Sequence, residues 1–184
     1  MELSGTAYVI LGMLRHEPRT GYEIKQIVDK STRFFWAASY GQIYPELRKL
    51  DDAGLIRGAE QPRGGRRRKV FTLTPAGRRE LRRWLDEPPE TFELRDEGLL
   101  KLFFSDAGTP EAARENVAAR RRIHEEKLAQ LREMEPAVEK LDDPYPQMVL
   151  RHGIEYSQSI IDWCERTERE LAGLARGRRR RRAA

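Results

Sequence analysis

Two groups of side chains have the types and the spacing that would bind a polyanion and read its bases. Gln42 can pair with an adenine edge, Arg48 with a guanine edge or a phosphate, and Tyr44 with a phosphate or a thymine methyl group. Further along, four arginines gather around a glycine pair: Arg63, Arg66, Arg67 and Arg68. Guanidinium groups neutralise phosphates, so this cluster predicts salt-sensitive affinity for a nucleic-acid backbone. Together the two groups predict double-stranded DNA as a partner.

A short helix over residues 40–53 is expected to position the first group. Its apolar residues recur at helical spacing and predict one buried face: Ile43, Leu47 and Leu50. Ser39 fits as the N-cap and Gly54 as the stop, while Pro45 predicts a softened or kinked start. Ser39 and Tyr40 lie at the helix start, where backbone N–H groups also bind phosphate. Tyr40 and Tyr44 are equally candidates for packing beside the core.

The arginine cluster falls at the tip of a predicted β-hairpin. Gly64 and Gly65 separate two short apolar runs, residues 55–57 and 69–74, and Phe71 and Leu73 take alternate positions in the second run. A helix, a glycine stop, a strand, an arginine-tipped turn and a second strand make up the back half of a winged helix-turn-helix. In such a fold the helix would enter the major groove.

Side chains that could perform catalysis or bind metals are few and scattered. His16, His124 and His152 have no metal-ligand spacing and complete no catalytic triad. Cys164 is the single cysteine, which excludes an internal disulfide, and it is expected to be a small buried thiol rather than a nucleophile. We therefore expect no enzyme activity, no metal and no cofactor.

The formal net charge of +5 over 184 residues hides a division along the chain. Residues 1–85 carry 17 Lys and Arg against 9 Asp and Glu, whereas residues 86–175 carry 12 against 21. This asymmetry predicts that only the first half meets a polyanion. The sequence has no apolar run of membrane-spanning length and no N-terminal leader pattern, which predicts a cytoplasmic protein that does not enter a membrane.

The expected fold class is mainly α. Residues 1–86 are expected to form a winged helix-turn-helix domain, with helices and a two-stranded wing, and residues 87–175 an all-helical domain. The boundary falls at a proline-containing break where the charge changes sign. Residues 176–184 contain six arginines and are expected to form a disordered tail, which either adds sequence-independent DNA affinity or has no role.

The last helix of the second domain has the most regular apolar spacing, close to that of a coiled-coil seam. The predicted seam residues include Val149, Tyr156, Ile160, Trp163 and Leu171. Long charged helices with narrow apolar stripes cannot build a large core alone. We therefore expect a second copy to pack against this seam and complete the core, and the protein is predicted to be a homodimer.

Four stretches resemble the signature of the PadR family of bacterial transcriptional regulators. They are residues 21–24 (Gly-Tyr-Glu-Ile), 40–47 (Tyr-Gly-Gln-Ile-Tyr-Pro-Glu-Leu), 53–56 (Ala-Gly-Leu-Ile) and 73–77 (Leu-Thr-Pro-Ala-Gly). The resemblance implies a winged-helix DNA-binding domain and a helical half that forms a homodimer. It also implies repression from an inverted-repeat operator, often relieved by a small molecule.

An effector of this kind would be a small aromatic or phenolic compound, held between the two domains or at the dimer interface. Trp36, Phe104 and Trp163 are the candidate lining residues, and they serve equally well as core. The alternative interpretation is a winged helix used as an interaction module or as an architectural DNA binder. Such a binder would discriminate little between sequences and would have no effector.

Overall fold

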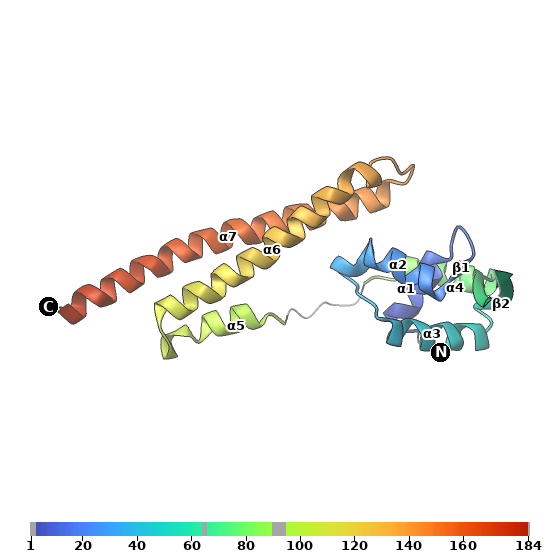
Figure 1. Cartoon of the computed structure of the whole chain (residues 1–184), viewed down its shortest axis with the longest axis horizontal. Coiled ribbons are helices and arrows are strands. Elements are labelled where there is room, and N and C mark those ends of the chain that lie inside the picture. The colour runs from blue at the N-terminus through green and yellow to red at the C-terminus, as the bar shows by residue number, and fades with distance from the viewer. Residues whose placement is uncertain (1–2, 64–65, 90–94, 184) are drawn as a thin grey trace. The chain divides into compact units, whose positions relative to one another are not determined.

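The structure is a computed structural model that describes residues 3–63, 66–89 and 95–183, without the side chains of residues 62, 63, 66, 67 and 176–183. The chain divides into two compact units, one ending at residue 91 and the other beginning at residue 92 (Figure 1). The fold is mainly α, as predicted.

The first unit contains four α-helices: α1 (Gly5–Met13), α2 (Gly21–Asp29), α3 (Tyr40–Asp52) and α4 (Pro75–Asp86). A 3₁₀ turn, η1 (Thr32–Phe34), lies in the connection between α2 and α3. Side chains cap the N-termini of α1 and α4. The hydroxyls of Ser4 and Thr74 accept hydrogen bonds from backbone N–H groups three residues later. The core is mostly aliphatic and collects residues from all four helices and the sheet, among them Ile10, Leu11, Ile24, Ile43, Leu47, Leu50, Ile56 and Leu81.

The sheet of this unit has three antiparallel strands in the order β1-β3-β2. Strands β2 (Ile56–Arg63) and β3 (Arg66–Leu73) form the wing, and their pairing runs from Ile56 with Leu73 to Arg63 with Arg66. The wing is thus longer than predicted, since polar residues extend both strands. The predicted two-stranded wing is confirmed, and β1 (Arg19–Thr20), which was not predicted, pairs with β3 as a third strand of the sheet.

Helix α3 follows the predicted pattern closely. Ile43, Leu47 and Leu50 are buried, and Gly54 ends the helix with a positive φ of 68°. The helix continues through Pro45 as one element, although proline has no N–H and the carbonyl of Gly41 therefore loses its i+4 partner. The helix has no break at its start.

The second unit consists of α5 (Glu97–Phe103), a 3₁₀ turn η2 (Ser105–Ala107), α6 (Pro110–Val138) and α7 (Pro144–Ala183). Helices α6 and α7 lie side by side along most of α6 (Figure 1). Ala113, Val117, Cys164 and Leu171 form a small core between them. Pro136 lies inside α6, which ends two residues later at Val138. None of the described helices combines the length and apolarity needed to cross a membrane.

The residues of α7 that are buried within the chain are mostly not those of the predicted dimer seam. The buried line is Leu150, Ser157, Ile161, Cys164 and Leu171. The predicted seam lies one position earlier for most of its length: Val149 and Tyr156 are 46% and 41% exposed, Ile160 and Trp163 are half-buried, and Leu171 is buried inside its own chain. The small side chains of Ser157 and Cys164 favour close approach of α6.

Helix α7 also continues to Ala183, through most of the segment that was expected to be a disordered tail. Arginine and alanine are good helix formers, and this segment follows directly on an established helix. The backbone of residues 176–183 is thus helical in the structure, the disorder of this basic tail stays a prediction, and residue 184 lies outside the described residues.

Candidate nucleic-acid interface

The exposed face of α3 carries the predicted base-reading side chains. Ser39, Tyr40, Gln42, Tyr44 and Arg48 are all exposed, and Tyr40 and Tyr44 are each 43% exposed. The buried residues of α3 lie on the opposite side of the helix, so this face is free to meet a partner. Whether these five residues contact DNA stays a prediction.

Three tyrosine rings continue this face toward α2. The ring of Tyr40 stacks on Tyr22 of α2 at 6.5 Å and on Tyr44 at 6.1 Å between centroids. The Nζ atom of Lys25 lies 5.4 Å from the centroid of the Tyr40 ring. Tyr40 therefore packs against its neighbours on the surface and outside the aliphatic core. Tyr22, which the sequence analysis did not select, is 55% exposed and belongs to the same row.

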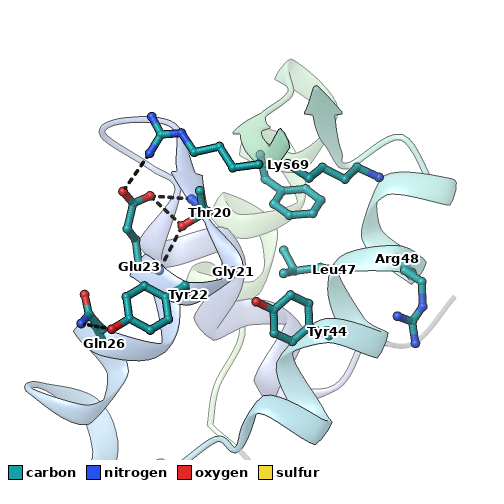
Figure 2. Close-up of a pocket in the computed structure, with 11 residues that line it drawn as sticks. Thr20, Gly21, Tyr22, Glu23, Gln26, Tyr44, Leu47, Arg48 and Lys69 are labelled. Atoms are coloured by element: carbon teal, nitrogen blue, oxygen red, sulfur yellow. Dashed lines mark hydrogen bonds and ion pairs between the residues drawn. The ribbon is translucent and has the colours of Figure 1, made fainter. Parts of the chain in front are cut away.

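A groove of about 770 Å³ lies between the start of α2, the outer face of α3 and the base of the wing. Figure 2 shows Tyr22 from α2 and Tyr44 from α3 on its two sides, with Lys69 of β3 above them. Gly21 allows the close approach of the two helices, because a Cβ atom there would lie 2.9 Å from Cε1 of Tyr44. The groove exposes aromatic and basic groups together, a combination suited to a nucleic-acid backbone.

The start of α2 is held by a capping box. The backbone N–H of Thr20 donates to Oε2 of Glu23 at 2.7 Å, and the N–H of Glu23 donates to Oγ1 of Thr20 at 3.2 Å. The hydrogen bonds that the carboxylate of Glu23 accepts, first from the Thr20 backbone N–H and then from the Thr20 hydroxyl at 2.9 Å, lower the pKa of that carboxyl. The other carboxylate oxygen of Glu23 faces Arg68, with Nη1 of Arg68 3.6 Å away (Figure 2).

The wing arginines are therefore not all at the tip. Arg68 pairs in register with Gln61, well inside the hairpin, and its guanidinium faces the start of α2. Its placement at the tip was wrong, because the strands extend further than the apolar pattern indicates. The side chains of Arg63, Arg66 and Arg67 lie outside the described residues, and their role in phosphate binding stays a prediction.

The base of the wing is attached to the end of α3 by one carboxylate. Asp51 accepts hydrogen bonds from Nζ of Lys69 at 2.7 Å and from the backbone N–H of Gly58 at 3.0 Å. Both interactions, led by the one from Lys69, lower the pKa of Asp51. A single side chain of the helix thus contacts both strands of the wing.

The three candidate effector residues are divided between the two units. Trp36, in the first unit, is 47% exposed and covers Gly5, where a Cβ atom would lie 2.0 Å from Cζ2 of its ring. In the second unit the Arg120 guanidinium lies 5.6 Å from the centroid of the Trp163 ring. Phe104 is 59% exposed and meets Phe103 edge to face at 5.0 Å.

Burial and charge perturb two titratable groups of the second unit, His124 and Cys164. Among the described residues, no three His, Cys, Asp or Glu side chains group as metal ligands. Burial, followed by the positive charges of Arg120 and Lys127, lowers the pKa of His124. Cys164 is fully buried, and this burial raises the pKa of its thiol.

Known proteins match the chain over both units. Residues 10–83 match the model of the transcriptional regulator PadR-like family, and residues 94–172 match the model of the virulence activator alpha C-terminal region. The negative transcriptional regulator PadR of Bacillus subtilis is 32% identical over 170 residues, which span 86% of this chain and 92% of that protein. This chain belongs to the PadR family of transcriptional regulators.

Solved structures of PadR family members have the same winged-helix and helical architecture. Bacillus subtilis PadR in complex with operator DNA superposes with a TM-score of 0.81 at 29% identity, covering 90% of this chain and 98% of that one. The Vibrio cholerae virulence activator AphA gives a TM-score of 0.76 at 29% identity over 93% of this chain and 100% of that one. Bacillus subtilis PadR in complex with p-coumaric acid gives 0.74 at 26% identity, covering 93% and 99%. The PadR family consists of regulators rather than enzymes.

Proposed function

We propose that the chain is a homodimeric repressor that binds an inverted-repeat operator with α3 in the major groove and the wing beside it. The observation that carries this proposal is the exposed Tyr40, Gln42, Tyr44 and Arg48 face of α3 next to a groove lined by aromatic and basic groups. The operator complex of the similar Bacillus subtilis PadR supports the same kind of partner here. A repressor of this kind would act on DNA in the cytoplasm, which is part of the same proposal.

The dimensions of α3 suit this role. Its 13 residues make a helix of about 20 Å, and a major groove about 12 Å wide admits one α-helix. Tyr44 and Arg48 are four residues apart and therefore lie on one stripe, whereas Gln42, two residues before Tyr44, projects from a different side of the exposed surface. Arg48 is long enough to reach a guanine edge or a phosphate, and Ser39 and Tyr40 at the helix start are positioned for a phosphate.

Selection of bound sequences from random duplex DNA tests this proposal directly. We expect a recovered inverted repeat with half-sites one or two helical turns apart, and affinity that falls steeply with salt. Arg48→Ala should weaken binding to the recovered site by about fivefold or more, equivalent to at least 1 kcal/mol. Arg132→Ala, which removes an exposed arginine of α6, is the matched control and should change nothing.

The outcome also separates the repressor from the architectural alternative. Salt-sensitive binding without any consensus would support a low-specificity DNA binder and contradict the operator-reading role. In vitro transcription from a promoter that carries the recovered repeat distinguishes repression from activation, because a repressor lowers the amount of transcript.

Several apolar side chains of the second unit support the proposed homodimer. Leu100 and Phe103 of α5 are 58% and 80% exposed, Phe104 at its C-cap is 59% exposed, and Val149 and Tyr156 of α7 are also open to a partner. Apolar side chains of this size are costly to leave in water, and a second copy would bury them. The sequence analysis selected the α7 residues but not Leu100 or Phe103, and it selected Phe104 only as a candidate effector residue.

Sedimentation equilibrium tests the dimer and its interface. The wild-type chain should sediment as a dimer at micromolar concentration. Phe103→Glu should shift the chain toward monomer if α5 contributes to the interface, and Val149→Glu should do so if α7 contributes. Arg132→Glu is the charge-changing control on α6. A wild-type chain that stays monomeric over the whole range would contradict the proposal.

We propose further that a small aromatic or phenolic acid releases the operator. Bacillus subtilis PadR in complex with p-coumaric acid supports this class of effector. Beside Trp163, the Nε atom of Arg120 is buried without a hydrogen-bond partner among the described residues. The same holds for the Nδ1 atom of His124, which lies four residues further along α6, beside the ring of Tyr156. Such atoms are costly unless a ligand or a water satisfies them. Trp36 and Phe104 remain the other candidate lining residues.

Tryptophan fluorescence over a panel of phenolic acids tests the effector. Quenching should be saturable in the wild-type chain, and Trp163→Phe should remove it if the acid binds beside Arg120. Trp84→Phe is the matched control, because it removes a tryptophan of α4 in the first unit that is not a candidate lining residue. A signal that no compound of the panel changes would contradict an aromatic effector.

A further inference from the structure

Gln42 is held in one orientation by the start of its own helix. Its Oε1 atom accepts a hydrogen bond from the backbone N–H of Ser39 at 2.9 Å and a second from Oγ of Ser39 at 3.1 Å. A backbone N–H can only donate, so the atom that faces it must be the amide oxygen rather than the nitrogen. The two otherwise interchangeable ends of the Gln42 amide are therefore assigned by the donor at Ser39.

This orientation leaves only the NH₂ group for a partner. An amide oxygen has two lone pairs, and both are used by Ser39. Gln42 is exposed, and among the described residues none accepts a hydrogen bond from its Nε2 atom. At the surface that α3 offers, Gln42 thus presents hydrogen-bond donors and no acceptor.

From this arrangement we propose that Gln42 determines specificity by donating to a guanine edge, and that it does not make the usual glutamine contact with adenine. The inference rests on the proposed entry of α3 into the major groove. A bidentate contact with adenine needs a donor for N7 and an acceptor for the N6 amino group, and the acceptor is already used. Guanine offers two neighbouring acceptors, N7 and O6, and matches a side chain that can only donate.

The capping interaction also stabilises this preference. Turning the amide to offer Oε1 to adenine would leave the Ser39 N–H and hydroxyl without their acceptor at the first turn of α3. The other bases fit less well, because cytosine presents an amino donor and thymine a single acceptor. We expect the wild-type chain to prefer guanine over adenine at the Gln42-dependent position by about fivefold or more.

Two variants separate capping from base reading. Gln42→Glu keeps an acceptor for Ser39, since Ser-x-x-Glu is itself a capping box, but replaces the outward NH₂ group by a second acceptor. Gln42→Ala removes both functions. Thermal unfolding of each variant identifies the capping effect, so that the base preference can be interpreted separately.

Selection from random duplex DNA is then run with all three proteins. The wild-type half-site should contain a guanine that Gln42→Glu replaces by cytosine or adenine, which have amino donors, while Gln42→Ala leaves that position degenerate. Preference at the position is compared within each protein, because the added charge of Gln42→Glu weakens binding to every sequence. Replacing the guanine by 7-deazaguanine should reduce binding by the wild-type chain and leave Gln42→Ala unaffected.

The results that would overturn the inference are distinct. An adenine at the Gln42-dependent position would show that the capping contact opens on binding. A consensus that neither variant changes would mean that Gln42 only caps α3 or contacts a phosphate. A wild-type selection without any consensus would instead overturn the proposed function, and the inference with it.

Discussion

Replacing Gly77 by alanine tests how closely α4 packs on the turn that follows α3. Gly77 is buried in the first turn of α4, and a Cβ atom there would lie 2.0 Å from the carbonyl oxygen of Leu55 and 2.8 Å from Cδ1 of Leu73. The Leu55 carbonyl would need to move by about 1 Å simply to relieve the overlap. It is main chain and cannot swing away as a flexible side chain would.

The magnitude follows from what the Leu55 carbonyl does. It accepts hydrogen bonds from the N–H and the hydroxyl of Thr74 at 3.1 and 2.9 Å, and the movement would stretch both. Each hydrogen bond contributes about 1 kcal/mol net, and overpacking adds about 1–3 kcal/mol. The helix preference for alanine offsets about 1 kcal/mol. We expect Gly77→Ala to lower the free energy of unfolding of the first unit by about 2–4 kcal/mol.

Gly12→Ala is the matched control, because Gly12 lies in α1 and a Cβ atom there meets nothing within 4 Å. It should stabilise the unit by up to about 1 kcal/mol. Urea unfolding followed by tryptophan fluorescence measures both variants, since Trp84 of α4 stacks on Tyr8 at 4.5 Å and reports on this packing. A Gly77→Ala chain as stable as Gly12→Ala would refute the reasoning.

Three further predictions concern titratable groups. Since burial lowers the pKa of His124 below its ordinary 6.5, the stability of the second unit should be complete above pH 6.5 and fall as the pH drops through the folded pKa. His124→Gln should flatten this dependence in thermal melts, and an unchanged slope would contradict it. Asp51→Asn should lower the free energy of unfolding by only about 1 kcal/mol, because Lys69 is partly exposed. It should also weaken DNA binding, measured by fluorescence anisotropy. Undiminished affinity would show that the base of the wing needs no such contact. The Cys164 thiol should react slowly with a disulfide reagent in the native chain and rapidly in denaturant, and fast native labelling would contradict its burial.

The parts of the fold with strong local signals were predictable from the sequence. Helix α3 has an apolar period, a cap at Ser39 and a glycine stop at Gly54, and all three agree. The wing was predictable from its glycine pair and from the alternation around Phe71. Strand β1 was not, because two residues are too short to show a period, and its pairing with β3 is a tertiary interaction.

The candidate site was less predictable than the fold. Arg68 was assigned to the wing tip, because nothing apolar marks how far polar strand residues continue to pair. The predicted dimer seam of α7 stays a prediction, whereas the line that α7 buries within its own chain was not anticipated, since Ser157 and Cys164 look unlike core residues although their small size suits the contact with α6. The capping role of Gln42 has a sequence signal, a serine followed three residues later by glutamine, that was interpreted only as base reading.

The bond between Asp51 and the wing has a consequence for the DNA as well as for the protein. Because one carboxylate holds both Gly58 and Lys69, the end of α3 and the base of the wing have little freedom to separate. In a complex of the proposed kind, the duplex must then supply the matching groove width, and a sequence that is stiff at the wrong width must be deformed at an energetic cost. Base pairs that the protein never touches would thereby influence which operators it binds.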